Sequence, residues 1–126
     1  MKSTFKYFLL FFLVLSYSTI KAQNYKEVLK SSHIKNFYDG TNFNTIKIKD
    51  GIHYETIENR YLVVSKVIWI DDQSFFLEII ENDVPDFPFS SGARMKINIL
   101  KKENDFIFYE AELRGKKFKG KYQIIK

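Results

Sequence analysis

A two-residue alternation of apolar and polar side chains runs through most of this chain and limits the folds open to it. Ile46 and Ile48 alternate with lysines, and the segment Phe118 to Ile124 repeats the pattern near the C-terminus. Turn signals, of which Asp50-Gly51 is the strongest, interrupt the alternation at intervals of roughly 8–12 residues. Because successive side chains of a strand point to opposite faces, this pattern predicts short antiparallel strands.

Seven or eight such strands are expected, joined mainly by tight hairpins. The longest apolar run, residues 61–70, is interrupted only at Ser65-Lys66. It predicts either a strand covered on both faces or a strand bent by a bulge near Ser65. A meander of this length has to protect its edges, and closure into a barrel does so. We therefore expect an all-β fold, either a small up-and-down, lipocalin-like barrel or a highly curved antiparallel sheet.

A short helix is expected before the strands. Glu27 follows Asn24 by three residues, which is the spacing of a helix N-cap and its capping box. Tyr25, Val28 and Leu29 then fall on one face of that helix. This apolar face would cover one end of the sheet.

The first 22 residues have the composition of a secretory signal. Lys2 and Lys6 provide a positive start, an apolar run covers residues 7–17, and the small residue Ala22 ends a polar stretch. The run is shorter than the about 20 apolar residues of a membrane span. Cleavage after Ala22 leaves a single domain, residues 23–126, in the periplasm or outside the cell, with no stable membrane anchor.

Composition limits the partners and the chemistry. Loss of the leader removes three lysines and no acid, so the formal charge falls from +5 to +2, which does not suit a nucleic-acid-binding domain. The chain has no cysteine, and therefore neither disulfides nor a lipoprotein anchor. It has only two histidines, His33 and His53, and no motif of nucleophilic hydrolases. We expect a non-enzymatic protein without a metal or a cofactor.

The expected architecture indicates a binding function by analogy. The interior of an eight-stranded barrel is either filled by side chains or wide enough for one small ligand. We expect an exported binding protein that holds a small apolar ligand among inward-facing aromatic side chains. The residues expected to point inward and to bind it are Phe37, Tyr54, Trp69, Phe75, Phe108 and Tyr122.

Residues 82–93 form the only long connection and contain both prolines. Within it, Asp86-Phe87-Pro88-Phe89 presents two aromatic rings. These rings either fold back over one end of the core as a plug or contact a partner. The second possibility gives the main alternative function, an envelope accessory or protein-interaction module that uses Asp86, Phe87 and Phe89.

Charges are segregated along the chain. Residues 67–93 carry six acids and no base, whereas residues 114–126 carry six bases and no acid. An acidic end could bind Ca²⁺ or a basic partner and a basic strand could touch anionic lipid or polysaccharide, but solvated strand faces explain both patterns. A weaker alternative function is a carboxylate-dependent hydrolase, since Glu110 and Glu112 share one strand face about 7 Å apart.

A wider pattern resembles a family of small exported proteins from Bacteroidota such as flavobacteria. It consists of the segment 37–43, Phe-Tyr-Asp-Gly-Thr-Asn-Phe, then Glu55, the segment 67–70 and the aromatic strand from Phe106 to Tyr109. The resemblance implies an exported protein without an established activity. Some members carry an automated label of DNA topoisomerase IV, which we reject here because 104 exported residues leave no room for its ATPase or DNA-cleavage domains. Many members look like lipoproteins, but this chain lacks their N-terminal cysteine.

Overall fold

A computed structural model describes residues 24–126 of the chain. The expected leader, residues 1–22, lies outside the described residues, so its cleavage and the export of the protein stay predictions.

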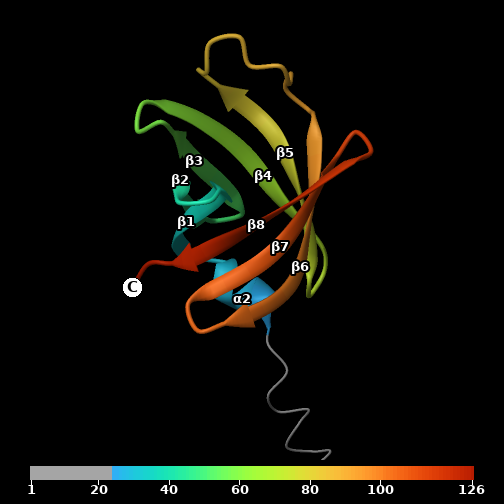
Figure 1. Cartoon of the computed structure of the whole chain (residues 1–126). Coiled ribbons are helices and arrows are strands. Elements are labelled where there is room, and N and C mark those ends of the chain that lie inside the picture. The colour runs from blue at the N-terminus through green and yellow to red at the C-terminus, as the bar shows by residue number, and fades with distance from the viewer. Residues whose placement is uncertain (1–23) are drawn as a thin grey trace, which may run out of the picture.

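Eight antiparallel strands form a closed barrel, in which consecutive strands pair and the last strand pairs with the first. The expected all-β, up-and-down barrel is therefore confirmed (Figure 1). A short helix, α2 (Tyr25–Leu29), precedes the strands. The strands are β1 (Ser32–Asp39), β2 (Asn42–Lys49), β3 (Ile52–Ile57), β4 (Tyr61–Asp71), β5 (Ser74–Asn82), β6 (Arg94–Glu103), β7 (Phe106–Leu113) and β8 (Lys116–Ile124).

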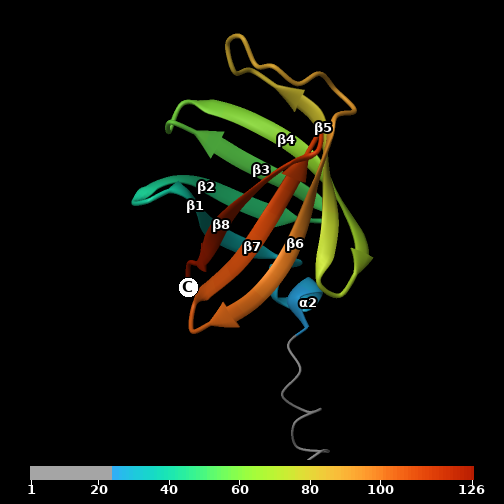
Figure 2. The same cartoon turned by 45° about the vertical axis from the view of Figure 1, so that its right-hand side comes forward.

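The two ends of the barrel differ. The connections β3–β4, β5–β6 and β7–β8 lie at one end, which we call the mouth, and the long β5–β6 loop is the most prominent of them (Figures 1 and 2). Helix α2 lies at the opposite end, which we call the helix end. Its N-cap is as expected, because the Asn24 side chain accepts a hydrogen bond from the Glu27 backbone N–H at 3.3 Å. Tyr25 and Leu29 are buried in the main core, so the helix packs against this end of the barrel.

Branched aliphatic side chains fill the middle of the barrel. Ile34, Ile46, Ile97 and Ile107 come from four different strands and are fully or almost fully buried. Around them lie Phe75 and Tyr122, which also point inward. The packed layer separates the helix end from the mouth.

The pairing of β4 with β5 is irregular near Ser65. Val64 pairs with Glu81 on β5, whereas the next residue, Ser65, pairs with Ile79, so one residue of β5 is left unpaired. The bulge near Ser65, one of the two expectations for this segment, is confirmed. Ser65 faces the interior of the barrel, where it is buried, because it pairs with the inward-facing His53 of β3.

The expected inward orientation is wrong for Phe37, Tyr54 and Phe108. Phe37 and Phe108 lie on the outer face, on either side of Lys121, which pairs with both of them across β8. The Lys121 ammonium lies 5.5 Å from the Phe37 ring centroid and the Lys101 ammonium lies 5.0 Å from the Phe108 ring centroid, so lysine side chains cover both outer rings. Tyr54 pairs with Lys47 and is 39% exposed.

Candidate functional site

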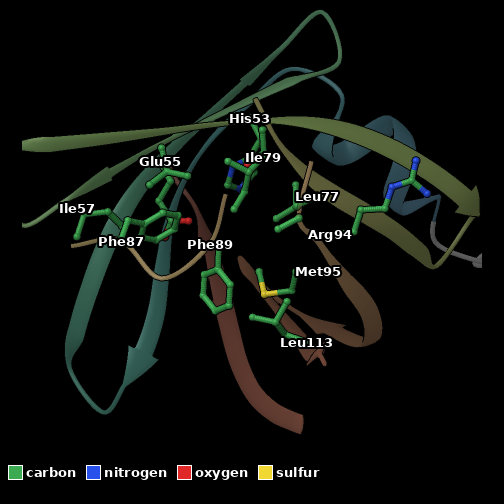
Figure 3. Close-up of a pocket in the computed structure, with 13 residues that line it drawn as sticks. His53, Glu55, Ile57, Leu77, Ile79, Phe87, Phe89, Arg94, Met95 and Leu113 are labelled. Atoms are coloured by element: carbon green, nitrogen blue, oxygen red, sulfur yellow. The ribbon is translucent and has the colours of Figure 1, made fainter. Parts of the chain in front are cut away.

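A cavity of about 160 Å³ opens at the mouth of the barrel (Figure 3). Strands β3 to β7 and the β5–β6 loop supply its walls, and most of its lining is apolar. The lining residues are His53, Glu55, Ile57, Val63, Ser65, Leu77, Ile79, Phe87, Phe89, Ala93, Arg94, Met95 and Leu113.

Strand β3 directs two polar side chains into the barrel. The turn before it is a two-residue turn in which both Asp50 and Gly51 have positive φ, 52° and 77°. This turn geometry fixes the register of the β2–β3 hairpin, so that His53 lies opposite Ile48. Because Ile48 faces the core, His53 does too, and Glu55 follows two residues later on the same face.

His53 is buried in the cavity wall, with only 2% of its surface exposed. Among the described residues, neither Nδ1 nor Nε2 finds a hydrogen-bond partner. Burial lowers the pKa of His53 below its ordinary value, an effect that the nearby Glu55 carboxylate opposes. The imidazole is therefore neutral at neutral pH, and an unpaired buried polar group of this kind costs about 1–3 kcal/mol.

Two amide side chains hold the carboxylate of Glu55. Its Oε2 accepts hydrogen bonds from Nδ2 of Asn36 at 3.1 Å and from Nδ2 of Asn44 at 3.3 Å. The hydroxyl of Tyr109 donates to Oδ1 of Asn36 at 2.5 Å. This chain of bonds links four strands, β7, β1, β3 and β2, and fixes the orientation of Glu55 at the edge of the cavity.

The Tyr109 ring is itself tightly placed. It stacks on Tyr122 with 4.4 Å between ring centroids and an interplanar angle of 25°. Burial raises the pKa of both phenols, so both are uncharged at neutral pH. The hydroxyl end of the ring lies against Gly120, where an added Cβ would lie 2.6 Å from Cζ of Tyr109. Gly120 thus makes room for the phenol that supports the Glu55 network.

The β5–β6 loop brings two aromatic rings over the cavity. Phe87 and Phe89 are half-buried, line the cavity and pack edge to face at 5.6 Å. Both ends of the loop are tied to the barrel, since the Asp83 carboxylate accepts from the Leu62 N–H at 2.6 Å and the Gly92 N–H donates to the Ile79 carbonyl at 2.8 Å. Asp86 is exposed beside these rings. Nothing in the structure tests the expected partner contact of Asp86, Phe87 and Phe89, which stays a prediction.

None of the six side chains expected to bind a ligand lines the mouth cavity. Trp69 and Phe75 do point inward, with 4.7 Å between their ring centroids, but they line a separate pocket of about 230 Å³ beside α2. Tyr122 is part of the packed core. His53, Glu55 and Ser65 were not expected as site residues, although the Asp50-Gly51 turn already determines on which face His53 and Glu55 lie.

The carboxylates considered for hydrolysis do not reach the cavity. Glu110 pairs with Lys119 and Glu112 with Lys117 across β7 and β8, on the outer face of the barrel. Residues 24–126 contain no cluster of three or more histidine, cysteine, aspartate or glutamate side chains placed to hold a metal ion. Within the same residues, no helix has the length and apolar character needed to cross a lipid bilayer.

Comparison with known proteins gives no relative from which a function could be transferred. No protein-family model, no curated protein and no solved structure matches this chain. The resemblance to exported proteins of Bacteroidota stays a prediction.

Proposed function

We propose that the protein is an exported, non-enzymatic binding protein of the periplasm or cell surface that holds a small, largely apolar ligand in the mouth cavity. The observation that carries this proposal is the buried and unpaired imidazole of His53 in an otherwise apolar wall. An unpaired buried imidazole lowers the stability of the free protein. Its presence is explained if a bound ligand supplies the missing hydrogen-bond partner. Small-molecule sites commonly combine an apolar lining with a few such polar groups.

The volume of the cavity limits the size of the ligand. An engineered, apolar cavity of about 150 Å³ is known to bind benzene. The mouth cavity, at about 160 Å³, suits a monocyclic aromatic compound or a part of a larger ligand that extends past the loop. Benzene and toluene are therefore suitable probes of the site.

Toluene is expected to bind to the full chain in a saturable manner, detected as chemical-shift changes in two-dimensional amide NMR spectra. The largest changes are expected at β3 and at Ala93, which lines the cavity. The variant Ala93→Leu places additional methyl groups there and should remove binding, whereas Lys119→Ala on the outer face should not. Unsaturable shifts spread over the whole surface, or equal binding by Ala93→Leu, would contradict the proposal.

The two loop rings provide a test against the alternative function, a protein-interaction module. Replacement of both Phe87 and Phe89 by alanine is expected to weaken toluene binding about tenfold, which corresponds to about 1.4 kcal/mol. Because both rings are only half-buried and lie on a loop, the free energy of unfolding should change by less than about 1 kcal/mol. Urea unfolding and the NMR titration measure the two effects. Unchanged toluene affinity would favour a role of these rings in partner binding.

A further inference from the structure

The two charged residues that line the mouth cavity differ in the direction of their side chains. Among the described lining residues, only Glu55 and Arg94 carry a charge at neutral pH. The Arg94 guanidinium points away from the cavity and binds the Glu78 carboxylate at 2.9 Å (Figure 3). Glu55, in contrast, lies on the inward face of β3 beside His53. The lining residues therefore present one anion and no cation to the cavity. The Arg114 guanidinium, which is not part of the lining, lies 5.2 Å from the Phe89 ring centroid.

The Glu55 carboxylate is held in place by hydrogen bonds to only one of its two oxygens. Both of its hydrogen bonds go to Oε2, and within residues 24–126 no donor is bonded to Oε1. Since Asn36 is itself fixed by Tyr109, the carboxylate is oriented before any ligand arrives. A charged acceptor with a free oxygen at an apolar site favours a cationic donor, because charge-assisted hydrogen bonds are roughly twice as strong as neutral ones.

The neighbouring groups are also compatible with a cation. The Phe87 ring lines the same cavity, and the face of an aromatic ring attracts positive charge. The Phe89 ring already has the Arg114 guanidinium 5.2 Å from its centroid. His53 is neutral and therefore does not repel a cation, and one of its two unpaired nitrogens is an acceptor. An ammonium group has three donors, so it can serve Glu55 and His53 together. A carboxylate ligand would instead meet the charge of Glu55 without compensation.

We propose that the ligand of the mouth cavity carries a small ammonium group on an apolar body, and that Glu55 binds this group. The inference rests on the proposed ligand-binding function and specifies its chemistry. It excludes fatty acids and other carboxylates as ligands that place their head group inside the barrel.

Four compounds of nearly equal size test the inference: benzylamine, benzyl alcohol, toluene and benzoate. Titrated into the full chain at pH 7.5 and followed by NMR, benzylamine is expected to bind at least about tenfold more tightly than benzyl alcohol or toluene. Benzoate should show no saturable binding. Raising the salt concentration should reduce the preference only weakly, since the carboxylate lies largely inside the barrel.

The variant Glu55→Gln isolates the charge, because glutamine keeps the shape of the side chain. It should lose the preference for benzylamine over toluene, whereas Glu110→Gln at the outer face should retain it. Equal binding of all four compounds, or a preference for benzoate, would overturn the inference and leave the ligand-binding function intact. Binding of none of them would contradict the proposed function itself. If Glu55→Gln does not fold, the ranking of the four compounds on the unmodified protein decides the question.

Discussion

Replacement of His53 by leucine is expected to stabilise the protein while it abolishes the binding of benzylamine. The imidazole has no partner among the described residues, and leucine has a similar volume without polar atoms. Removal of an unsatisfied buried group of this kind should raise the free energy of unfolding by about 1–2 kcal/mol. Stability and binding are thus expected to change in opposite directions, which is typical of a residue retained for function.

Urea unfolding at pH 7.5 and NMR titration with benzylamine measure the two effects. His33→Leu is the matched control, because His33 is the other histidine of the chain and lies exposed on β1. It should leave both quantities nearly unchanged. A loss of more than about 1 kcal/mol in His53→Leu would show that the imidazole has a structural role, and it would remove the main support for the binding site.

The lowered pKa of His53 also determines how the free energy of unfolding should depend on pH. Its pKa is lowered in the folded protein, so the unfolded chain takes up a proton at the ordinary value near 6.5 while the folded chain does not. Stability is therefore complete above this pH and falls as the pH decreases below it, by up to about 1.4 kcal/mol per pH unit until the folded-state pKa is reached. Urea unfolding between pH 7.5 and 5 should show this decline in the unmodified protein and in His33→Leu, but a weaker one in His53→Leu.

The architecture could be predicted from the sequence because its signals are local. Alternation within each strand and tight turns between strands determine a meander, and closure of a long meander removes its edges. The orientation of β3 was also contained in the sequence. In a two-residue turn at Asp50-Gly51, His53 has to share the face of Ile48. The expectation for Tyr54 followed hydrophobicity and neglected this register, and for that reason it was wrong.

The outward aromatic side chains could not be predicted in the same way. Lys121 covers Phe37, and this contact depends on the closing pair β1–β8, which joins residues far apart in the sequence. Phe108 is instead covered by Lys101 of β6. On β7 both faces are apolar, so periodicity alone does not decide between Phe108 and Tyr109 as the inward residue. The cavity itself is the volume that the side chains of several strands leave unfilled, and no single segment encodes it.

Replacement of Gly120 by alanine is expected to destabilise the protein by about 2–3 kcal/mol, a typical cost of overpacking in a well-packed interior. The new Cβ would lie 2.6 Å from Cζ of Tyr109, so the ring would have to move. Its stacking on Tyr122 and its hydrogen bond to Asn36 prevent a small adjustment. Alanine and glycine differ by one methyl group. The loss in free energy of unfolding therefore measures how closely the Tyr109 ring approaches residue 120.

A double-mutant cycle with Tyr109→Leu separates this clash from a general effect of alanine in β8. If the ring causes the cost, Gly120→Ala should cost at least about 1 kcal/mol less in the Tyr109→Leu background. Lys119→Ala, the neighbouring substitution on the outer face, should change stability by less than about 0.5 kcal/mol. Equal costs in both backgrounds would contradict the steric explanation.

The same substitution should also affect the site, because Tyr109 acts on Glu55 through Asn36. Displacement of the ring removes one support of the carboxylate while the apolar cavity walls remain. Gly120→Ala is therefore expected to weaken benzylamine binding by more than toluene binding, measured in the same NMR titrations at a temperature where the variant is folded. An equal loss for both compounds would show that the ring stabilises the barrel without positioning Glu55.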